Sequence, residues 1–116
     1  MNRRSIGTEY EKAAGAFLMQ HGYRILEYNY RCSRAEIDIV AREGRFLVFA
    51  EVKYRKNRHE GSAAEAVDER KKRRIRMGAA AYLKERRCPL TTPVRFDVVS
   101  IDAGKIRLIR NAFLFR

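Results

Sequence analysis

Hydrophobic residues recur every three or four positions near the start of the chain. The spacing of residues such as Ala14 and Leu18 predicts a helix over about residues 8–21. Gly22 follows directly and is typical of the position where a helix ends. A second segment, from about residue 63 to residue 87, contains no proline and predicts a long helix.

Runs of β-branched and aromatic residues predict five strands between and after these helices. They occupy residues 23–30, 35–41, 45–55, 94–101 and about 105–109. Glu43-Gly44 and Ala103-Gly104 predict hairpin turns. The order α-β-β-β-α-β-β therefore favours an α/β domain with a mixed central sheet flanked by helices. Because no repeat or Pro/Gly-rich linker interrupts it, we expect one domain over residues 1–116.

The third predicted strand carries two charged residues in an otherwise apolar segment. One of its alternating faces begins with Leu47 and Phe49 and continues with Glu51 and Lys53. A strand that begins apolar on both faces is expected to be buried, and a buried pair of opposite charges needs a reason.

The pairing of the second and third strands decides which charges lie together. A two-residue turn at Glu43-Gly44 would place Asp38 opposite Phe49. It would also place Glu36 opposite Glu51, and residues opposite each other share a face. An odd-length loop would turn one strand over. With the even loop, four charged residues are expected on one face: Glu36, Asp38, Glu51 and Lys53.

Such a cluster of carboxylates predicts a bound cation, because the carboxylates repel one another without one. Lys53 supplies part of the positive charge, and a divalent ion such as Mg²⁺ with oxygen ligands would supply the rest. Glu-x-Lys on one strand suits phosphodiester hydrolysis, in which the lysine activates water or stabilises charge on phosphorus. The alternative is a solvent-facing hairpin with Glu–Lys cross-strand pairs, and the spacing alone does not decide between them.

Composition points to a polyanionic partner. The 116 residues include 26 Lys and Arg against 14 Asp and Glu, a formal net charge of +12. Basic groups near phosphates release counterions, so nucleic acid is the natural partner, although ribosomal RNA or a membrane surface would fit the charge alone. No apolar run approaches about 18 residues and no signal-peptide pattern opens the chain, so a cytoplasmic location away from membranes is expected. Cys32 and Cys88 are isolated, which favours reduced thiols over a disulfide or a zinc site.

The long helix places Lys71 inside its apolar stripe. Either its stem packs while the ammonium reaches water, or the stripe faces a charged cleft where Lys71 would contact phosphate. Basic residues surround it, and together they predict a phosphate-contacting surface without a base-reading motif. The residues expected to contact nucleic acid are Arg55, Lys56, Lys71, Lys72 and Arg74.

Two further acidic positions stay open at this point. Glu9 and Glu11 flank the apolar stripe of the first helix about equally, so periodicity does not choose between them. Asp97 lies in a strand-like run, where a surface or structural role is expected.

Several motifs together resemble the YraN-type family of small bacterial proteins. They are Gly7-x-x-x-Glu11, Gly22-Tyr23-x-Ile25-Leu26-x-x-Asn29, Glu36-Ile-Asp38-Ile-Val-Ala41, Leu47-Val-Phe-x-Glu51-Val-Lys53-x-Arg55, Glu65-Ala-Val67-x-x-x-Lys71 and Arg95-Phe-Asp97-Val-Val. The resemblance covers nearly the whole chain. It implies a three-layer restriction-endonuclease-like fold of the PD-(D/E)xK type, similar to archaeal Holliday junction resolvases. One departure is Ala35, where the family pattern commonly has glycine.

The resemblance also implies roles at matching positions. Glu11 would be the acid of the first helix that completes the site. Asp38 and Glu51 would bind Mg²⁺ or Mn²⁺, with the Val52 carbonyl as a third ligand, and Lys53 would be the catalytic lysine. Lys71 lies in a family motif without a defined role there.

These observations lead us to expect a metal-dependent endonuclease acting on structured or branched DNA in recombination or repair. A homodimer is expected only by analogy with the resolvases. One alternative is a nucleic-acid-binding module that keeps the fold without cutting. Another is a basic structural or ribosome-associated protein, whose binding would prefer RNA and collapse with salt.

Overall fold

The computed structural model describes residues 3–55 and 67–115, with side chains from Glu9 onward. It contains the two helices and five strands expected, in the expected order. Their bounds are α1 Arg3–Gln20, β1 Arg24–Cys32, β2 Ala35–Glu43, β3 Phe46–Arg55, α2 Glu69–Glu85, β4 Val94–Asp102 and β5 Lys105–Phe113.

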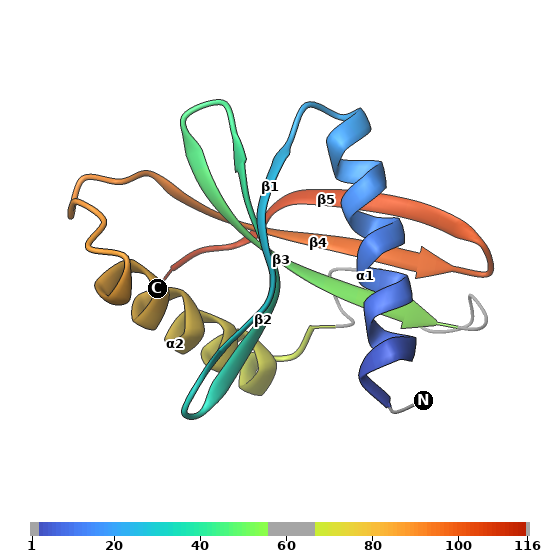
Figure 1. The fold of residues 1–116 in the computed structure, drawn as a ribbon, viewed down its shortest axis with the longest axis horizontal. Coiled ribbons are helices and arrows are strands. Elements are labelled where there is room, and N and C mark those ends of the chain that lie inside the picture. The colour runs from blue at the N-terminus through green and yellow to red at the C-terminus, as the bar shows by residue number, and fades with distance from the viewer. Residues whose placement is uncertain (1–2, 56–66, 116) are drawn as a thin grey trace.

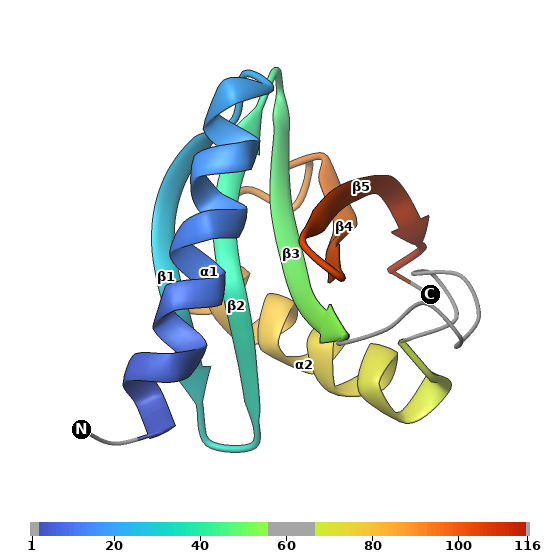
Figure 2. The ribbon, with the colours of Figure 1, turned by 90° about the vertical axis from the view of Figure 1, so that its right-hand side faces the viewer.

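The five strands form one mixed sheet in the order β1-β2-β3-β4-β5. All neighbours are antiparallel except β3 and β4, which are parallel. A parallel pair needs a crossover connection, and α2 lies in that connection. The helices lie on opposite sides of the sheet (Figures 1 and 2), so the expected α/β architecture with helices flanking a mixed sheet is confirmed. In the described part of the chain, neither helix combines the length and the apolar character that a membrane crossing requires.

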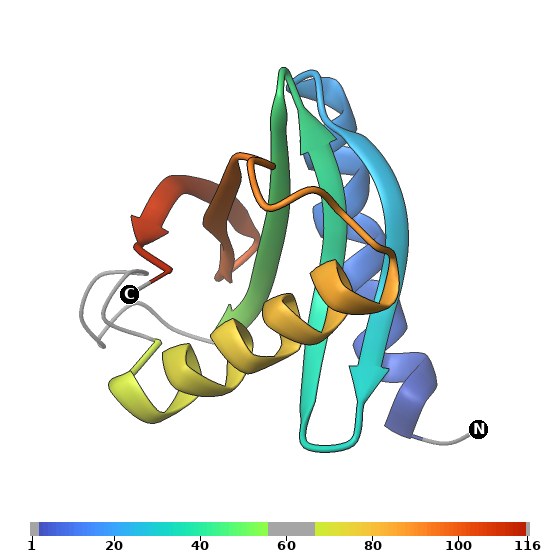
Figure 3. The same cartoon turned by 90° about the vertical axis from the view of Figure 1, so that its left-hand side faces the viewer.

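Each helix covers its own hydrophobic cluster. On the α1 face, Ala14 and Leu18 pack with Ile39 and Val48. On the α2 face, which Figure 3 shows from the front, the largest buried side chains include those of Ile75, Phe49 and Phe96. Burying one such large side chain contributes about 1.5–3 kcal/mol, so these two clusters hold the three layers together.

The α2 helix approaches the sheet closely because one of its contact residues has no side chain. A Cβ added at Gly78 would lie 2.9 Å from Ile37 Cδ1 on β2. This close approach packs α2 against β2 and β1. Lys71, near the N-terminal end of α2, reaches Glu51 on β3.

Two predicted helix boundaries differ in the structure. α1 begins at Arg3 rather than near Thr8. α2 begins at Glu69 rather than near Ala63, because Asp68 is extended and its side chain accepts a hydrogen bond from Lys71 N at 2.8 Å. An N-terminal cap of this kind satisfies an unpaired helix N–H and fixes where the helix starts. Residues 56–66, which include part of the predicted helix, lie outside the described residues.

The predicted turn between β2 and β3 was wrong by one residue. Glu43 pairs with Phe46, so the turn is Gly44-Arg45, and Gly44 takes a φ of +60°. Val40, not Asp38, consequently lies opposite Phe49. The register moves by two residues relative to the prediction, and a shift of two leaves the facing of the paired residues unchanged.

β1 and β2 both turn over at the same point along their length. In β2, Ile39 packs in the α1-face cluster and Ile37 in the α2-face cluster, although alternate residues of a regular strand share a face. In β1 the same change occurs between the paired Tyr28 and Tyr30, around Asn29 with its φ of +54°. Asp38 lies at this change of face, between the hydrophobic cluster under α1 and the one under α2.

Candidate active site

The candidate site lies where β2 and β3 separate. Their last paired residues are Ile39 and Ala50, and beyond this point the strands diverge toward the lower end of the views in Figures 2 and 3. The Asp38 side chain replaces the missing backbone partner, because its Oδ2 accepts a hydrogen bond from Val52 N at 2.8 Å. The local departure from regular pairing therefore holds the Asp38 carboxylate between the strands.

Glu51 approaches this point from β3 and meets a lysine from α2. Its side chain is only 8% exposed, and Lys71 Nζ lies 3.4 Å from its Oε2. The Lys71 side chain is 47% exposed, so one end of this salt bridge is buried and the other reaches solvent. Of the two roles considered for Lys71, the geometry favours the charged cleft over a lysine that merely escapes to water.

Glu11 completes the cluster from α1. It lies on the buried stripe with Ala14 and Leu18, whereas Glu9 is exposed. Burial thus separates the two glutamates that periodicity left equal. One carboxylate oxygen from each of Glu11, Glu36 and Asp38 lies within 4.8 Å of the others.

Burial and mutual repulsion raise the pKa values of the three innermost acids. Burial, followed by the charge of Asp38, raises the pKa of Glu11 to about 7. The same two causes raise the pKa of Glu51 to about 8, opposed by the Lys71 ammonium. Burial also raises the pKa of Asp38, against the lowering effect of the Val52 N–H. One ammonium therefore does not compensate this group of acids.

The donor set fits a small divalent cation. Glu11 Oε1 is buried and has no hydrogen-bond partner among the described residues, so a strong acceptor is left without a donor. A cleft of about 310 Å³ opens beside the acids, which leaves room for a hydrated ion and a phosphate. Carboxylate oxygens are the ligands that Mg²⁺ and Mn²⁺ prefer. The lining residues are Glu36, Asp38, Glu51, Val52, Lys71, Arg74 and Ile75.

Lys53 lies two residues beyond Glu51 on β3. Alternation places it on the same face as Glu51, and it pairs across the parallel ladder with Ser100. It is half-buried but is not among the residues that line the cleft. Within residues 3–55 and 67–115 it forms no salt bridge, so its ammonium is not neutralised there.

The residues expected to contact nucleic acid separate into groups. Lys71 and Arg74 line the cleft. Lys72 instead lies 3.1 Å from Glu69 Oε2 and over the Phe113 ring. The expected role of Arg55 does not match its position, because it is buried and its guanidinium donates to Asp102 at 2.7 and 3.0 Å. Lys56 lies outside the described residues.

Two residues near the acids had no role assigned from the sequence. Glu36 joins the carboxylate group and also lies 3.7 Å from Arg31 Nε. The Asn29 side chain lies near Glu11 and lowers the pKa of that acid, against the larger effects that raise it. Asparagine tolerates positive φ better than most residues, so the sequence did contain an indication of the turn-over at Asn29.

Asp97 is part of a separate buried network. It is fully buried and accepts hydrogen bonds from Tyr23 Oη at 2.6 Å, from Arg95 at 2.9 Å and from Asn111 N at 3.0 Å. Protein donors satisfy both carboxylate oxygens of Asp97, which indicates a structural role. Asp97 does not line the cleft.

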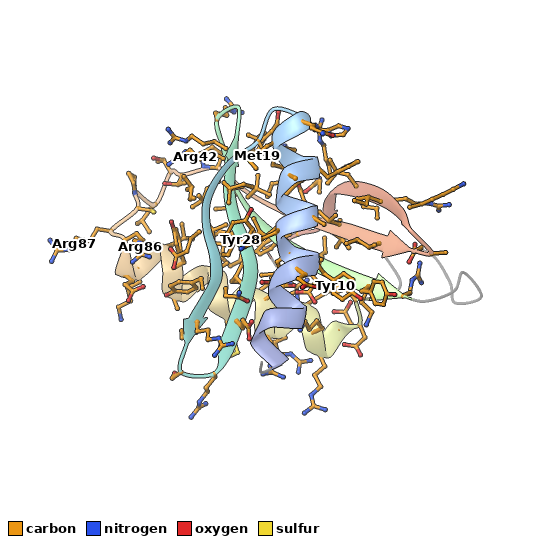
Figure 4. The ribbon with its side chains drawn as sticks, turned by 45° about the vertical axis from the view of Figure 1, so that its right-hand side comes forward. Tyr10, Met19, Tyr28, Arg42, Arg86 and Arg87 are labelled. Carbon is orange, nitrogen blue, oxygen red and sulfur yellow. The ribbon has the colours of Figure 1, made fainter. Side chains whose placement is uncertain are left out.

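Figure 4 shows residues at opposite sides of the molecule. Tyr10 projects from α1 toward the end of β3, where its ring stacks on Tyr54 with centroids 4.2 Å apart. Arg86 and Arg87 lie on the other side of the molecule, at the C-terminal end of α2. The acid cluster itself draws on α1, β2 and β3, and Lys71 of the first turn of α2 contacts it.

Comparison with known proteins gives a consistent family assignment. The model of the uncharacterised protein family UPF0102 matches residues 10–101. A UPF0102 protein of Lachnoclostridium phytofermentans is 50% identical over 113 residues, covering 97% of this chain and 96% of the relative. UPF0102 proteins of Vibrio parahaemolyticus and Symbiobacterium thermophilum are 42% and 44% identical, each covering more than nine-tenths of both chains. The matched region contains every acid of the cluster.

Proposed function

The chain belongs to the uncharacterised protein family UPF0102, and we propose that it is a metal-dependent endonuclease acting on structured or branched DNA. Membership confirms the family expected from the sequence motifs, while the names of the relatives state no activity. The proposal therefore depends on the chemistry of the cleft.

The observation that carries the proposal is a buried group of acids without enough positive charge. Glu11, Asp38 and Glu51 come from three different elements, and among residues 3–55 and 67–115 Lys71 is the cation within salt-bridge distance of one of them. Keeping such acids together lowers the stability of the fold, so their presence implies a function for the ionised group. A site for a divalent ion is the use that best accounts for the unpartnered Glu11 Oε1.

The proposed roles follow from these positions. Glu11, Asp38 and Glu51 would hold Mg²⁺ or Mn²⁺, with the Val52 carbonyl as a further ligand. Glu11 and Asp38 belong to the close carboxylate group, and Asp38, Glu51 and Val52 line the cleft. A bound ion of this kind lowers the pKa of water and stabilises negative charge on a phosphoryl group. Lys71 and Arg74 would bind the substrate phosphate at the mouth of the cleft. Lys53, on the face of Glu51, would stabilise charge that develops on phosphorus.

Overall, hydrolysis adds one water molecule across a phosphodiester. The oxygen of water bonds to phosphorus, the bond from phosphorus to one sugar oxygen breaks, and that oxygen leaves as a hydroxyl after taking up a proton. The high net charge of +12 would favour binding of the nucleic acid before this step.

A cleavage assay tests the proposal. Labelled four-way-junction, flap, single-stranded and linear duplex DNA would be incubated with Mg²⁺, Mn²⁺ or EDTA. The parent chain would be compared with Asp38→Asn, which keeps an acceptor for Val52 N, and with Glu27→Gln, whose carboxylate pairs with Arg86 away from the cleft. We expect metal-dependent cutting by the parent and by Glu27→Gln, and at least about a 100-fold loss in Asp38→Asn.

The same assay distinguishes the alternative. A binding module would bind DNA tightly and equally in the parent and Asp38→Asn, and would cut none of the four substrates with either metal. That result would contradict the endonuclease proposal.

A further inference from the structure

Two basic hollows adjoin the acid cleft. One lies against the hairpin of β1 and β2 and includes Arg31, Ser33 and Arg34. The other lies over the start of α2 and includes Arg70 and Lys71. The acids of the cleft therefore lie between two basic regions that come from distant parts of the chain.

Arg74 joins these regions. It lines the cleft, the hairpin hollow and the α2 hollow, and it is exposed. Glu36 in turn is shared by the cleft and the hairpin hollow. The three depressions thus share rim residues and form one continuous surface rather than three separate sites.

The charges on this surface are unevenly neutralised. Arg31 lies 3.7 Å from Glu36 and is partly compensated. Within residues 3–55 and 67–115, Arg34 and Arg74 form no salt bridge. Other exposed arginines in the described part of the chain also lack a salt bridge, so it is the position beside the cleft that distinguishes these two.

We propose that the β1–β2 hairpin forms the second arm of the substrate-binding surface and holds the phosphodiester backbone on one side of the cleaved bond. This inference rests on the proposed function. A nucleic-acid strand carries a negative charge on each side of the phosphate that enters the cleft, and the acids there repel those neighbouring phosphates. Arg34 on the hairpin and Lys71 with Arg70 on α2 offset that repulsion on opposite sides, with Arg74 between them.

The fold supplies a matched control for this proposal. Arg34 is the second residue of the two-residue turn between Cys32 and Ala35, which joins β1 to β2. Arg45 is the second residue of the two-residue turn between Glu43 and Phe46, which joins β2 to β3. Figure 1 shows these turns at opposite ends of the molecule, and both arginines are exposed. Arg34→Glu and Arg45→Glu therefore make the same change of charge in the same structural setting.

The experiment measures binding in EDTA, where cleavage does not interfere. Fluorescence anisotropy would use labelled DNA and RNA oligonucleotides of the same sequence with the parent, Arg34→Glu and Arg45→Glu. We expect Arg34→Glu to weaken binding at least about tenfold at low salt, and Arg45→Glu to change it less than about twofold. Arg34→Ala should lower the slope of log affinity against log salt by about 0.7–0.9, the loss of one phosphate contact.

A second comparison measures how much binding depends on Arg34 and how much on Arg74. Arg74→Glu should weaken binding more than Arg34→Glu does, because Arg74 lines all three depressions. Loss of DNA binding, RNA binding or both in Arg34→Glu supports the arm and identifies which backbone it holds. Equal effects of Arg34→Glu and Arg45→Glu would overturn it.

The failure of this inference is distinguishable from failure of the proposed function. A parent chain that cuts DNA, together with equal binding by Arg34→Glu and Arg45→Glu, would support the endonuclease and contradict the proposed role of the hairpin. A parent chain that never cuts, together with a loss of nucleic-acid binding in Arg34→Glu alone, would contradict the endonuclease and support a hairpin that binds nucleic acid.

Discussion

Two buried carboxylates on adjacent strands have opposite environments. Asp102 on β4 accepts two hydrogen bonds from Arg55 and one from the Ser100 hydroxyl, and Arg55 lowers the pKa of Asp102 to about 2. Glu51 on β3 is equally hidden from solvent, yet burial and Asp38 raise its pKa to about 8. Burial alone therefore does not determine the protonation state.

The difference lies in the partners. Asp102 has a guanidinium that fits its two oxygens, so the pair is neutral and hydrogen-bonded. Glu51 has one ammonium at 3.4 Å and shares it with a neighbouring acid. We infer that the Arg55–Asp102 pair stabilises the fold. We infer that the acids around Glu51 form a site whose excess negative charge is compensated by a bound ligand. Three predictions test this contrast.

The largest effect is expected from breaking the compensated pair. Arg55→Met leaves Asp102 buried without its cation, so the free energy of unfolding should fall by about 3–5 kcal/mol. Urea denaturation measures the loss. The double variant Arg55→Met with Asp102→Leu should recover most of it, because Asp102 is then no longer a buried charge without its cation. A single variant as stable as the parent would show that the pair does not support the fold.

A smaller effect of opposite sign is expected at the uncompensated acid. Because its folded pKa is about 8, Glu51 keeps a proton that the unfolded chain releases above its ordinary pKa of 4.5. Stability without metal should therefore fall as pH rises from 4.5 to 8. Glu51→Gln removes this loss, so at about pH 9 it should be more stable than the parent by at least about 1 kcal/mol.

The pH dependence of Asp102 has the reverse sign. Its folded pKa lies below the ordinary 3.8, so its stabilisation is fully present above that value and is lost as pH falls toward 2. Urea denaturation of the parent and Glu51→Gln from acid to alkaline pH measures both effects. The contrast would be contradicted if Glu51→Gln and the parent lost stability equally between pH 4.5 and 8.

The smallest effect separates two neighbouring lysines of α2. Lys71 is paired with Glu51 at the cleft, and Lys72 with Glu69 away from it. Lys71→Met should weaken oligonucleotide binding about five- to tenfold, the effect of losing one phosphate contact, whereas Lys72→Met should change it less than about twofold. Anisotropy in EDTA measures both. Equal changes would mean that Lys71 contributes only general charge.

Much of the fold could be predicted because it depends on local patterns. Helical periodicity, β-branched runs and glycine-containing turns indicated all seven elements in order. The register between β2 and β3 could not be predicted as well, because Gly44 fits a turn as its first or its second residue. The error left the facing of the paired residues unchanged, and beyond Ile39 and Ala50, where pairing ends, Asp38 and Glu51 line one cleft.

The contacts that the sequence did not reveal join distant residues. Arg55 was expected to contact nucleic acid, but its partner Asp102 lies 47 positions further along the chain, and no local pattern connects them. Similarly, the choice of Glu11 over Glu9 depended on the resemblance until the structure placed Glu11 on the buried stripe of α1. Tertiary packing, rather than residue type, distinguishes a structural charge from a functional one in these cases.

The central claim is that the acid cluster binds a divalent cation, and calorimetric titration with Mn²⁺ tests it most directly. The parent would be compared with Asp38→Asn in two buffers of different ionisation enthalpy at about pH 7, where the raised pKa values of Glu11 and Glu51 leave both acids partly protonated. We expect the parent to bind Mn²⁺ saturably and to release protons, and we expect Asp38→Asn to do neither. Absence of binding by the parent, or equal binding by Asp38→Asn, would contradict the central claim.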